Sequence, residues 1–193
     1  MQQTAGYDQA RADREDKLTP GQRASVRGLA REQANLKEET AGLAEKLDGA
    51  PVYALTLRRA AESMDLAARR LNTLKTDEDT RRAEKSAARR FDQLLESLRP
   101  DKKDGQGGGG GGGGGAQAGR RGDGIPDAAQ VKMLKKIQEE LNTRTEELDE
   151  VKERKKTLTD DQQAEVTRLQ DEQGTIADLA RDIARPRKDD GEE

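Results

Sequence analysis

Three pairs of adjacent carboxylates have the residue types and spacing that acid–base chemistry could use: Glu139-Glu140, Glu146-Glu147 and Asp160-Asp161. General acid–base catalysis would require a desolvated pocket that shifts their pKa values. All three pairs lie in charged stretches that also carry Lys and Arg, a pattern typical of solvated helix faces. We therefore predict no catalytic residues and a chain that is not an enzyme.

Metal and cofactor chemistry also finds little support in the residue types. The chain has no His and no Cys, which excludes thiolate zinc sites, Ser–His nucleophile pairs and Glu-x-x-His diiron sites. The string DGIPD resembles the end of an acidic calcium-binding repeat, but Gly119 and Arg121 occupy the positions where further carboxylates are needed. The tripeptide RGD before it is expected to be fortuitous. We predict no metal and no cofactor.

Nine consecutive glycines, Gly107–Gly115, could suggest a phosphate-binding loop. Such loops need a strand before a few glycines and a helix after them, and neither a strand pattern nor Gly-Lys-Ser/Thr is present. Consecutive glycines maximise chain entropy and bury nothing. We predict a disordered poly-Gly linker over 100–125, in which roughly 20 residues would span about 25 Å.

Basic residues gather before this linker. Residues 52–99 contain 11 basic and 8 acidic side chains, although the whole chain has a net charge of −3. Four arginine doublets lie there: Arg58-Arg59, Arg69-Arg70, Arg81-Arg82 and Arg89-Arg90. A basic stripe could bind phosphates, but the chain offers almost no aromatics to stack on bases and its acids are interspersed. Nucleic-acid binding is therefore one alternative function, and the soluble part of a cell-envelope protein is the other.

The composition indicates which elements carry these side chains. The chain is 39% charged, 31% hydrophobic and 2% aromatic. Abundant Ala, Glu, Lys, Leu and Arg with few aromatics is typical of long helices and coiled coils. We predict an all-α protein, an antiparallel helical bundle or coiled coil made of two helical units joined by the poly-Gly linker.

The first predicted unit covers 18–99, after a flexible N-terminus over 1–17. Thr19 and Gln22 form a capping box with Pro20 at the first helical position. A second helix is expected over 52–74. A third is expected to begin near Thr76, the predicted cap, and to end before Pro100.

The second predicted unit is a helical hairpin over 126–185, followed by a disordered tail over 186–193. Arg144 and Lys155 interrupt its apolar row, which lowers stability or sets register. Thr159 and Gln162 form another capping box, so a helix is expected to begin there.

Leucines recur at seven-residue intervals in both units, the spacing of a coiled-coil seam. We predict that these rows bind protein, either a second copy or another partner. The interaction seam is predicted to comprise Leu29, Leu36, Leu43, Leu57, Leu134, Leu141, Leu148 and Leu169.

The two capped starts also resemble each other. LTPGQRASVRGLAREQANL from Leu18 aligns with LTDDQQAEVTRLQDEQGTI from Leu158 at an offset of 140. Any two helix starts with leucine stripes align to some degree, but the matching Glu-Gln pairs at 32–33 and 172–173 are not required by a helical pattern. We interpret the match as an internal repeat.

The strings AARRFDQLLESLRPD and MLKKIQEELNTRTEELD, with 29–71 and 158–179, resemble the C-terminal helical region of a group of large uncharacterised bacterial proteins, some of them membrane-anchored. The resemblance implies no activity, and it implies that this chain could be a fragment. The N-terminus has no signal-like apolar region, and no apolar run approaches the ~20 residues of a membrane span. We expect a cytoplasmic location if the chain is complete and an envelope-associated one if it is a fragment.

Overall fold

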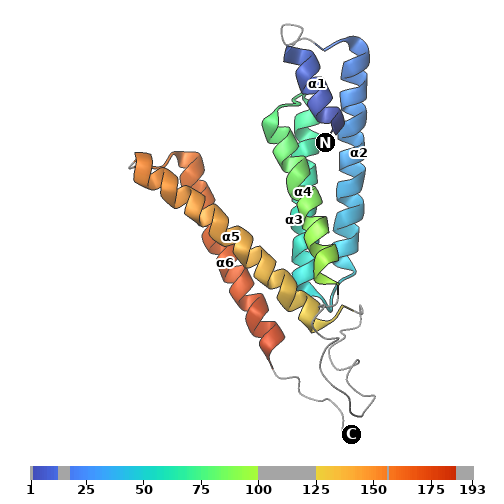
Figure 1. Ribbon diagram of the computed structural model, residues 1–193. Coiled ribbons are helices and arrows are strands. Elements are labelled where there is room, and N and C mark those ends of the chain that lie inside the picture. Colours follow the sequence, from blue (N-terminus) through green and yellow to red (C-terminus); the bar gives the residue numbers. More distant parts are fainter. Residues whose placement is uncertain (1, 13–17, 100–124, 156, 186–193) are drawn as a thin grey trace, which may run out of the picture. The chain divides into compact units, whose positions relative to one another are not determined.

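A computed structural model describes residues 2–12, 18–99, 125–155 and 157–185 (Figure 1). These residues are all-helical apart from short connections, as predicted. The chain divides into two compact units, Met1–Asp101 and Lys102–Glu193. The predicted poly-Gly linker, apart from its last residue, lies outside the described residues, as do the RGD tripeptide and the C-terminal tail. The helices are α1 (Gln2–Ala12), α2 (Pro20–Glu45), α3 (Pro51–Asn72), α4 (Glu78–Ser97), α5 (Asp127–Lys155) and α6 (Asp160–Ala184).

Both predicted capping boxes are confirmed. The Thr19 Oγ1 accepts from the Gln22 amide at 3.2 Å, and the Gln22 side chain accepts from the Thr19 amide at 2.8 Å. Thr159 and Gln162 make the same reciprocal pair at 3.3 and 3.0 Å. Each box satisfies two amides that a helix start would otherwise leave unpaired. α5 and α6 are consequently separate helices.

The first unit is built around α3, which packs against α2 on one side and α4 on the other. Consecutive helices are antiparallel. Thr40, near the end of α2, donates a hydrogen bond to Met64 of α3, and Tyr53, at the start of α3, hydrogen-bonds Ser97 at the end of α4. Burial raises the pKa of Tyr53, although its hydrogen bond with Ser97 opposes the shift. The face of α3 is rich in small residues, which allow neighbouring helices to approach closely. Its buried alanines are Ala54, Ala60, Ala61, Ala67 and Ala68.

The leucine row of α2 faces α3 only at its start, where Leu29 packs against the cluster that includes Leu71 of α3. Leu36 and Leu43 are 45% and 49% exposed, whereas Ala30 and Ala44 are buried. Leu43 precedes Ala44 by one position, so the leucine row is rotated by about 100° from the buried row. The reason is size: against an alanine-rich α3, small residues permit a close helix–helix contact that leucines would prevent.

A helix occupies part of the predicted flexible N-terminus. α1 contacts both α2 and α4. Thr4 is 1% exposed and donates to Glu84 of α4 at 2.7 Å, and Tyr7 packs against a cluster that includes Val26 and Leu71. α1 has no cap signal and little apolar periodicity, so tertiary contacts rather than local propensity stabilise it.

The connection between α3 and α4 differs by one residue from the prediction. Asp77, not Thr76, caps α4, and Thr76 is fully buried. Two residues after α3 ends, Leu74 lies in the left-handed region, at φ 61°, and the Lys75 amide donates to the Arg70 carbonyl at 2.9 Å. This is a Schellman-type end with leucine where glycine is usual. Leu74 packs against the cluster around Leu71, which offsets the backbone cost.

The second unit is the antiparallel hairpin of α5 and α6. Gln138 of α5 pairs with Gln173 of α6, and Arg144 pairs with Glu165, so residue numbers rise on one helix as they fall on the other. Leu141 and Leu169 are buried, at 3% and 6% exposure.

Candidate partner-docking surfaces

A groove runs between α2 and α4 above the surface of α3. We call it the α2/α4 groove. It has a volume of about 330 Å³ and is lined by Gln33, Leu36, Thr40, Met64, Glu84, Ala87, Ala88 and Phe91. Its walls come from α2 and α4 and its floor from Met64 of α3.

Apolar side chains extend the line of the groove toward the C-terminal ends of α2 and α4. Leu43 follows Leu36 by seven positions, and Leu95 and Leu98 follow Phe91 by four and seven, so helical spacing keeps each near the same face. Leu95 is 62% and Leu98 48% exposed. Single exposed leucines are ordinary, but a row on both walls of a groove is a candidate interaction site.

In the hairpin, ion pairs close one edge of the helix–helix seam. Arg144, a seam interruption in the sequence, pairs with both Glu165 and Glu172 of α6, the latter at 2.9 Å. Burial opposes the charge of Arg144, but its contacts with the two glutamates raise its pKa. A half-buried arginine with two partners fixes which residues of α5 and α6 meet. We call these three residues the ion clamp.

The other edge of the hairpin is open. A groove of about 440 Å³, the hairpin groove, is lined by Leu141, Asn142, Thr145, Glu146, Leu148, Asp149, Val166, Leu169, Gln170 and Gln173. Asn142 and Arg144 lie about 200° apart around α5, so the hairpin groove and the ion clamp occupy opposite edges. The apolar residues of the seam are therefore covered on one side and accessible on the other.

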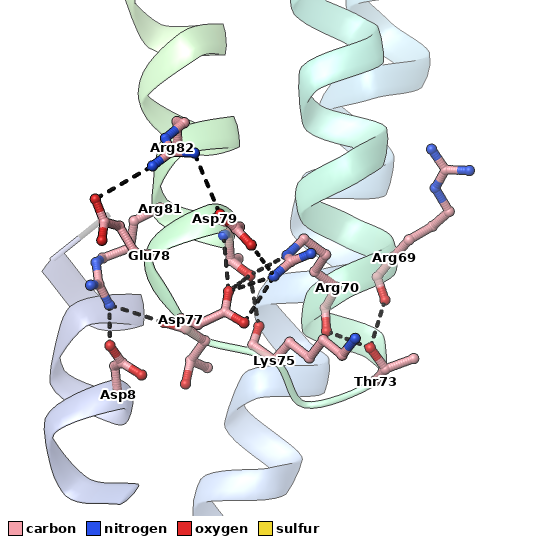
Figure 2. Close-up of polar contacts among 12 residues, drawn as sticks. Asp8, Arg69, Arg70, Thr73, Lys75, Asp77, Glu78, Asp79, Arg81 and Arg82 are labelled. Carbon is pink, nitrogen blue, oxygen red and sulfur yellow. Dashed lines mark hydrogen bonds and ion pairs between the residues drawn. The ribbon is translucent and has the colours of Figure 1, made fainter. Parts of the chain in front are cut away.

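The arginine doublets are largely engaged by carboxylates and hydroxyls. Figure 2 shows Arg70 reaching back to Asp77 and Asp79, at 2.7 and 3.1 Å, and Arg81 pairing with Asp8 of α1. Arg69, Arg82 and Arg90 also have partners on their own helices: Asp65, then Glu78 with Asp79, and Ser86. The Arg70 contacts tie the turn between α3 and α4 together, and the pairs with carboxylates balance much of the positive charge around it.

The Asp77 carboxylate makes the stability of the first unit depend on pH. Burial opposes its ionisation, but hydrogen bonds from Arg70 and Thr80 outweigh burial and hold the pKa of Asp77 below its ordinary value. A carboxylate whose pKa is lower in the folded state stabilises the fold above its unfolded pKa, about 3.9. That contribution is lost as the pH falls through the folded pKa.

We predict that Asp77→Asn lowers the melting temperature of the first unit at pH 7, and that the difference from wild type shrinks as the pH falls below about 4 and is lost below the folded pKa of Asp77. Asparagine caps helices as well as aspartate, so the variant isolates the charge. The measurement is thermal unfolding at a series of pH values. Asp65→Asn is the control, because Asp65 makes a surface pair with Arg69 within one helix. A pH-independent difference for Asp77→Asn would contradict the assignment.

The predicted seam residues lie in different environments. Leu57, Leu134, Leu141 and Leu169 are buried, Leu29 and Leu148 are half-buried, and Leu36 and Leu43 are exposed. The α2/α4 groove combines Leu36 with Met64 and Phe91, which no single-helix pattern groups together. Phe91 is the one Phe in the chain, and that rarity was the available signal.

The carboxylate pairs are not brought together with one another. Glu139, Glu146, Glu147 and Asp160 are exposed. Within the described ranges, no cluster of three or more acidic residues could hold a metal ion. No helix in the described part of the chain is long and apolar enough to cross a membrane.

Comparison with protein-family models, curated proteins and solved structures finds no match to this chain.

Proposed function

We propose that this chain is a non-enzymatic scaffold or protein–protein interaction module that associates through helical seams in the manner of a coiled coil. The observation that carries the proposal is the hairpin groove, where Leu148 and Val166 flank the buried Leu141 and Leu169 on an edge that neither α5 nor α6 covers. Two helices alone leave one side of such a seam in water. Covering it with further helices is how helical bundles gain apolar burial.

A second copy of the chain is the simplest partner for the hairpin groove. Four of its six polar lining residues are neutral, namely Asn142, Thr145, Gln170 and Gln173, and the other two, Glu146 and Asp149, are acidic. A two-fold association places like residues near like residues, so uncharged groups avoid the repulsion that a single-sign surface would produce. Two hairpins joined in this way would form a four-helix bundle.

The test is sedimentation of the full chain over a range of concentrations. Leu148→Asp should shift the association to at least tenfold higher concentration, because a charge would be placed in the apolar contact. Val131→Asp is the matched control, since Val131 is an apolar residue of α5 that is 52% exposed and outside the groove. A chain that stays monomeric at all concentrations, or equal effects of both variants, would count against self-association.

The ion pairs of the arginine doublets favour the interaction role over nucleic-acid binding. Arg69, Arg70, Arg81 and Arg82 already pair with carboxylates of the first unit. Phosphate binding would have to break those pairs. Absence of salt-dependent retention on DNA or RNA at low salt would remove this alternative.

A further inference from the structure

α1 acts as the fourth helix of the first unit, but only at one end. Thr4 of α1 hydrogen-bonds Glu84 of α4, and Asp8 of α1 pairs with Arg81 of α4. Residue numbers therefore rise along α1 as they fall along α4, so the two helices are antiparallel. It also contacts α2, and Tyr7 packs against the cluster around Leu71. At this end four helices alternate in direction around a shared core (Figure 1).

The position that α1 occupies continues beyond it. α1 has 11 residues, whereas α2 has 26. Thr4 is level with Glu84, and α4 extends 13 residues further, to Ser97, which corresponds to about 20 Å of helix. The α2/α4 groove begins at Gln33 and Glu84 and covers the first half of this stretch, to Phe91 on α4. Beyond it the exposed Leu95 and Leu98 continue the apolar line.

The hairpin shows what covers the equivalent row elsewhere in the chain. In the alignment of the two capped starts, Leu29 and Leu36 of α2 correspond to Leu169 and Ile176 of α6. The α6 residues are 6% and 5% exposed and belong to the helix that packs on antiparallel α5. Leu36 is 45% exposed. The leucine row of α2 is therefore suited to contact a helix that runs antiparallel to α2 and carries leucines at heptad spacing, as α5 does.

We propose that the α2/α4 groove binds one amphipathic helix of a partner protein, of about four turns, antiparallel to α2 and α4 and in line with α1. Its apolar stripe would resemble residues 134–148 of α5, in which leucines recur every seven positions. This is the helix-in-groove mode of recognition.

Other sources of the occupant fit less well. α5 already packs on α6, and α1 is already docked. The same groove of a second copy is concave, so two such grooves facing each other would leave their floors uncovered. The inference extends the proposed interaction role to a second surface, and it does not depend on self-association of the hairpin.

Charge is not expected to dominate this contact. The exposed charged side chains that follow the lining residues by one to three positions have both signs: Glu38 and Glu39 on α2, and Lys85, Arg89 and Asp92 on α4. Binding should thus depend on the apolar stripe and change little with salt.

The test supplies the missing helix by fusion. A copy of residues 134–148 joined directly before Met1 places Leu148 four positions before Thr4 and Leu141 seven positions earlier, so the leucines continue the inward row of α1. The melting temperature of the first unit should rise by roughly 5–10 °C. Near-ultraviolet circular dichroism reports this unit alone, because both tyrosines, Tyr7 and Tyr53, belong to it.

Two controls separate groove binding from a general effect of added helix. Two alanines inserted at the junction leave the added segment itself unchanged but rotate its leucine stripe by about 200° relative to α1. The rise in melting temperature should then be lost. Leu36→Asp should also remove it, whereas Leu66→Asp should not, since Leu66 is 44% exposed but outside the groove. A gain that survives the alanine insertion or Leu36→Asp would overturn the proposal.

Self-association of the native chain tests whether a second copy, rather than a partner helix, occupies the α2/α4 groove. If Leu36→Asp abolishes self-association while Leu66→Asp leaves it intact, a second copy fills the groove and the proposed partner helix is overturned. If Leu148→Asp abolishes it and Leu36→Asp does not, hairpin pairing and the α2/α4 groove are separate functions, as we infer. Failure of hairpin pairing alone leaves the fusion result unaffected.

Discussion

Leu71→Ala should lower the free energy of unfolding of the first unit by about 3 kcal/mol, within the roughly 2–5 kcal/mol typical of buried leucine truncations. Leu71 is fully buried in a cluster with Leu18, Val26 and Ala30. The variant loses the transfer free energy of the removed atoms and leaves a cavity where α1, α2 and α3 meet. Surrounding helices fixed by capping and ion pairs can close that cavity only in part.

The measurement is denaturant unfolding followed by near-ultraviolet circular dichroism of Tyr7 and Tyr53. Tyr7 packs against the same cluster, so its signal should change first as α1 loosens. Leu66→Ala is the control, because Leu66 on the same helix is 44% exposed, and its loss should be under about 1 kcal/mol. Similar losses in both variants would show that the cluster around Leu71 is not the core of the unit.

Local signals explain why helix starts and the all-α class could be predicted. The two capping boxes are written in four consecutive residues each, and their hydrogen bonds involve no other part of the chain. α3 begins at Pro51, one residue before the predicted start at 52. Such features depend on sequence within one turn of helix, so a single sequence suffices to find them.

Which face of a helix is buried depends instead on its neighbour. The heptad spacing of leucines in α2 predicts a leucine seam. The buried face of α3 is instead rich in alanine, and Ala30 and Ala44 are among the buried residues of α2. The leucines remain on the flank, where Leu36 becomes a wall of the α2/α4 groove. Periodicity identifies the helix and its candidate faces, while the size of the partner's residues selects among them.

Contacts between distant segments were not predictable for the same reason. α1 forms because Thr4 and Asp8 meet Glu84 and Arg81, residues more than 70 positions away. The sequence did mark Arg144 as an interruption of the α5 row. Its two partners on α6 follow only once the register of the hairpin is known.

Leu141→Asp should unfold most of the α5–α6 hairpin and abolish any association through it. Leu141 is 3% exposed and lies in the seam, so the change removes a buried apolar side chain and inserts a carboxylate, a combined loss of at least about 3 kcal/mol. Arg144, one turn away, offers limited rescue because Glu165 and Glu172 already hold it. A two-helix unit has little other core to absorb such a loss.

The expected signature is loss of far-ultraviolet helical signal from the 29-residue α5 and 25-residue α6, with an unchanged near-ultraviolet signal from Tyr7 and Tyr53. Sedimentation should show a monomer at concentrations where the wild-type chain associates. Val131→Asp on the exposed side of α5 should leave both measurements close to wild type. Helicity and sedimentation that stay unchanged in Leu141→Asp at pH 7 would contradict the hairpin seam itself, because an ionised aspartate cannot be buried there without separating the helices.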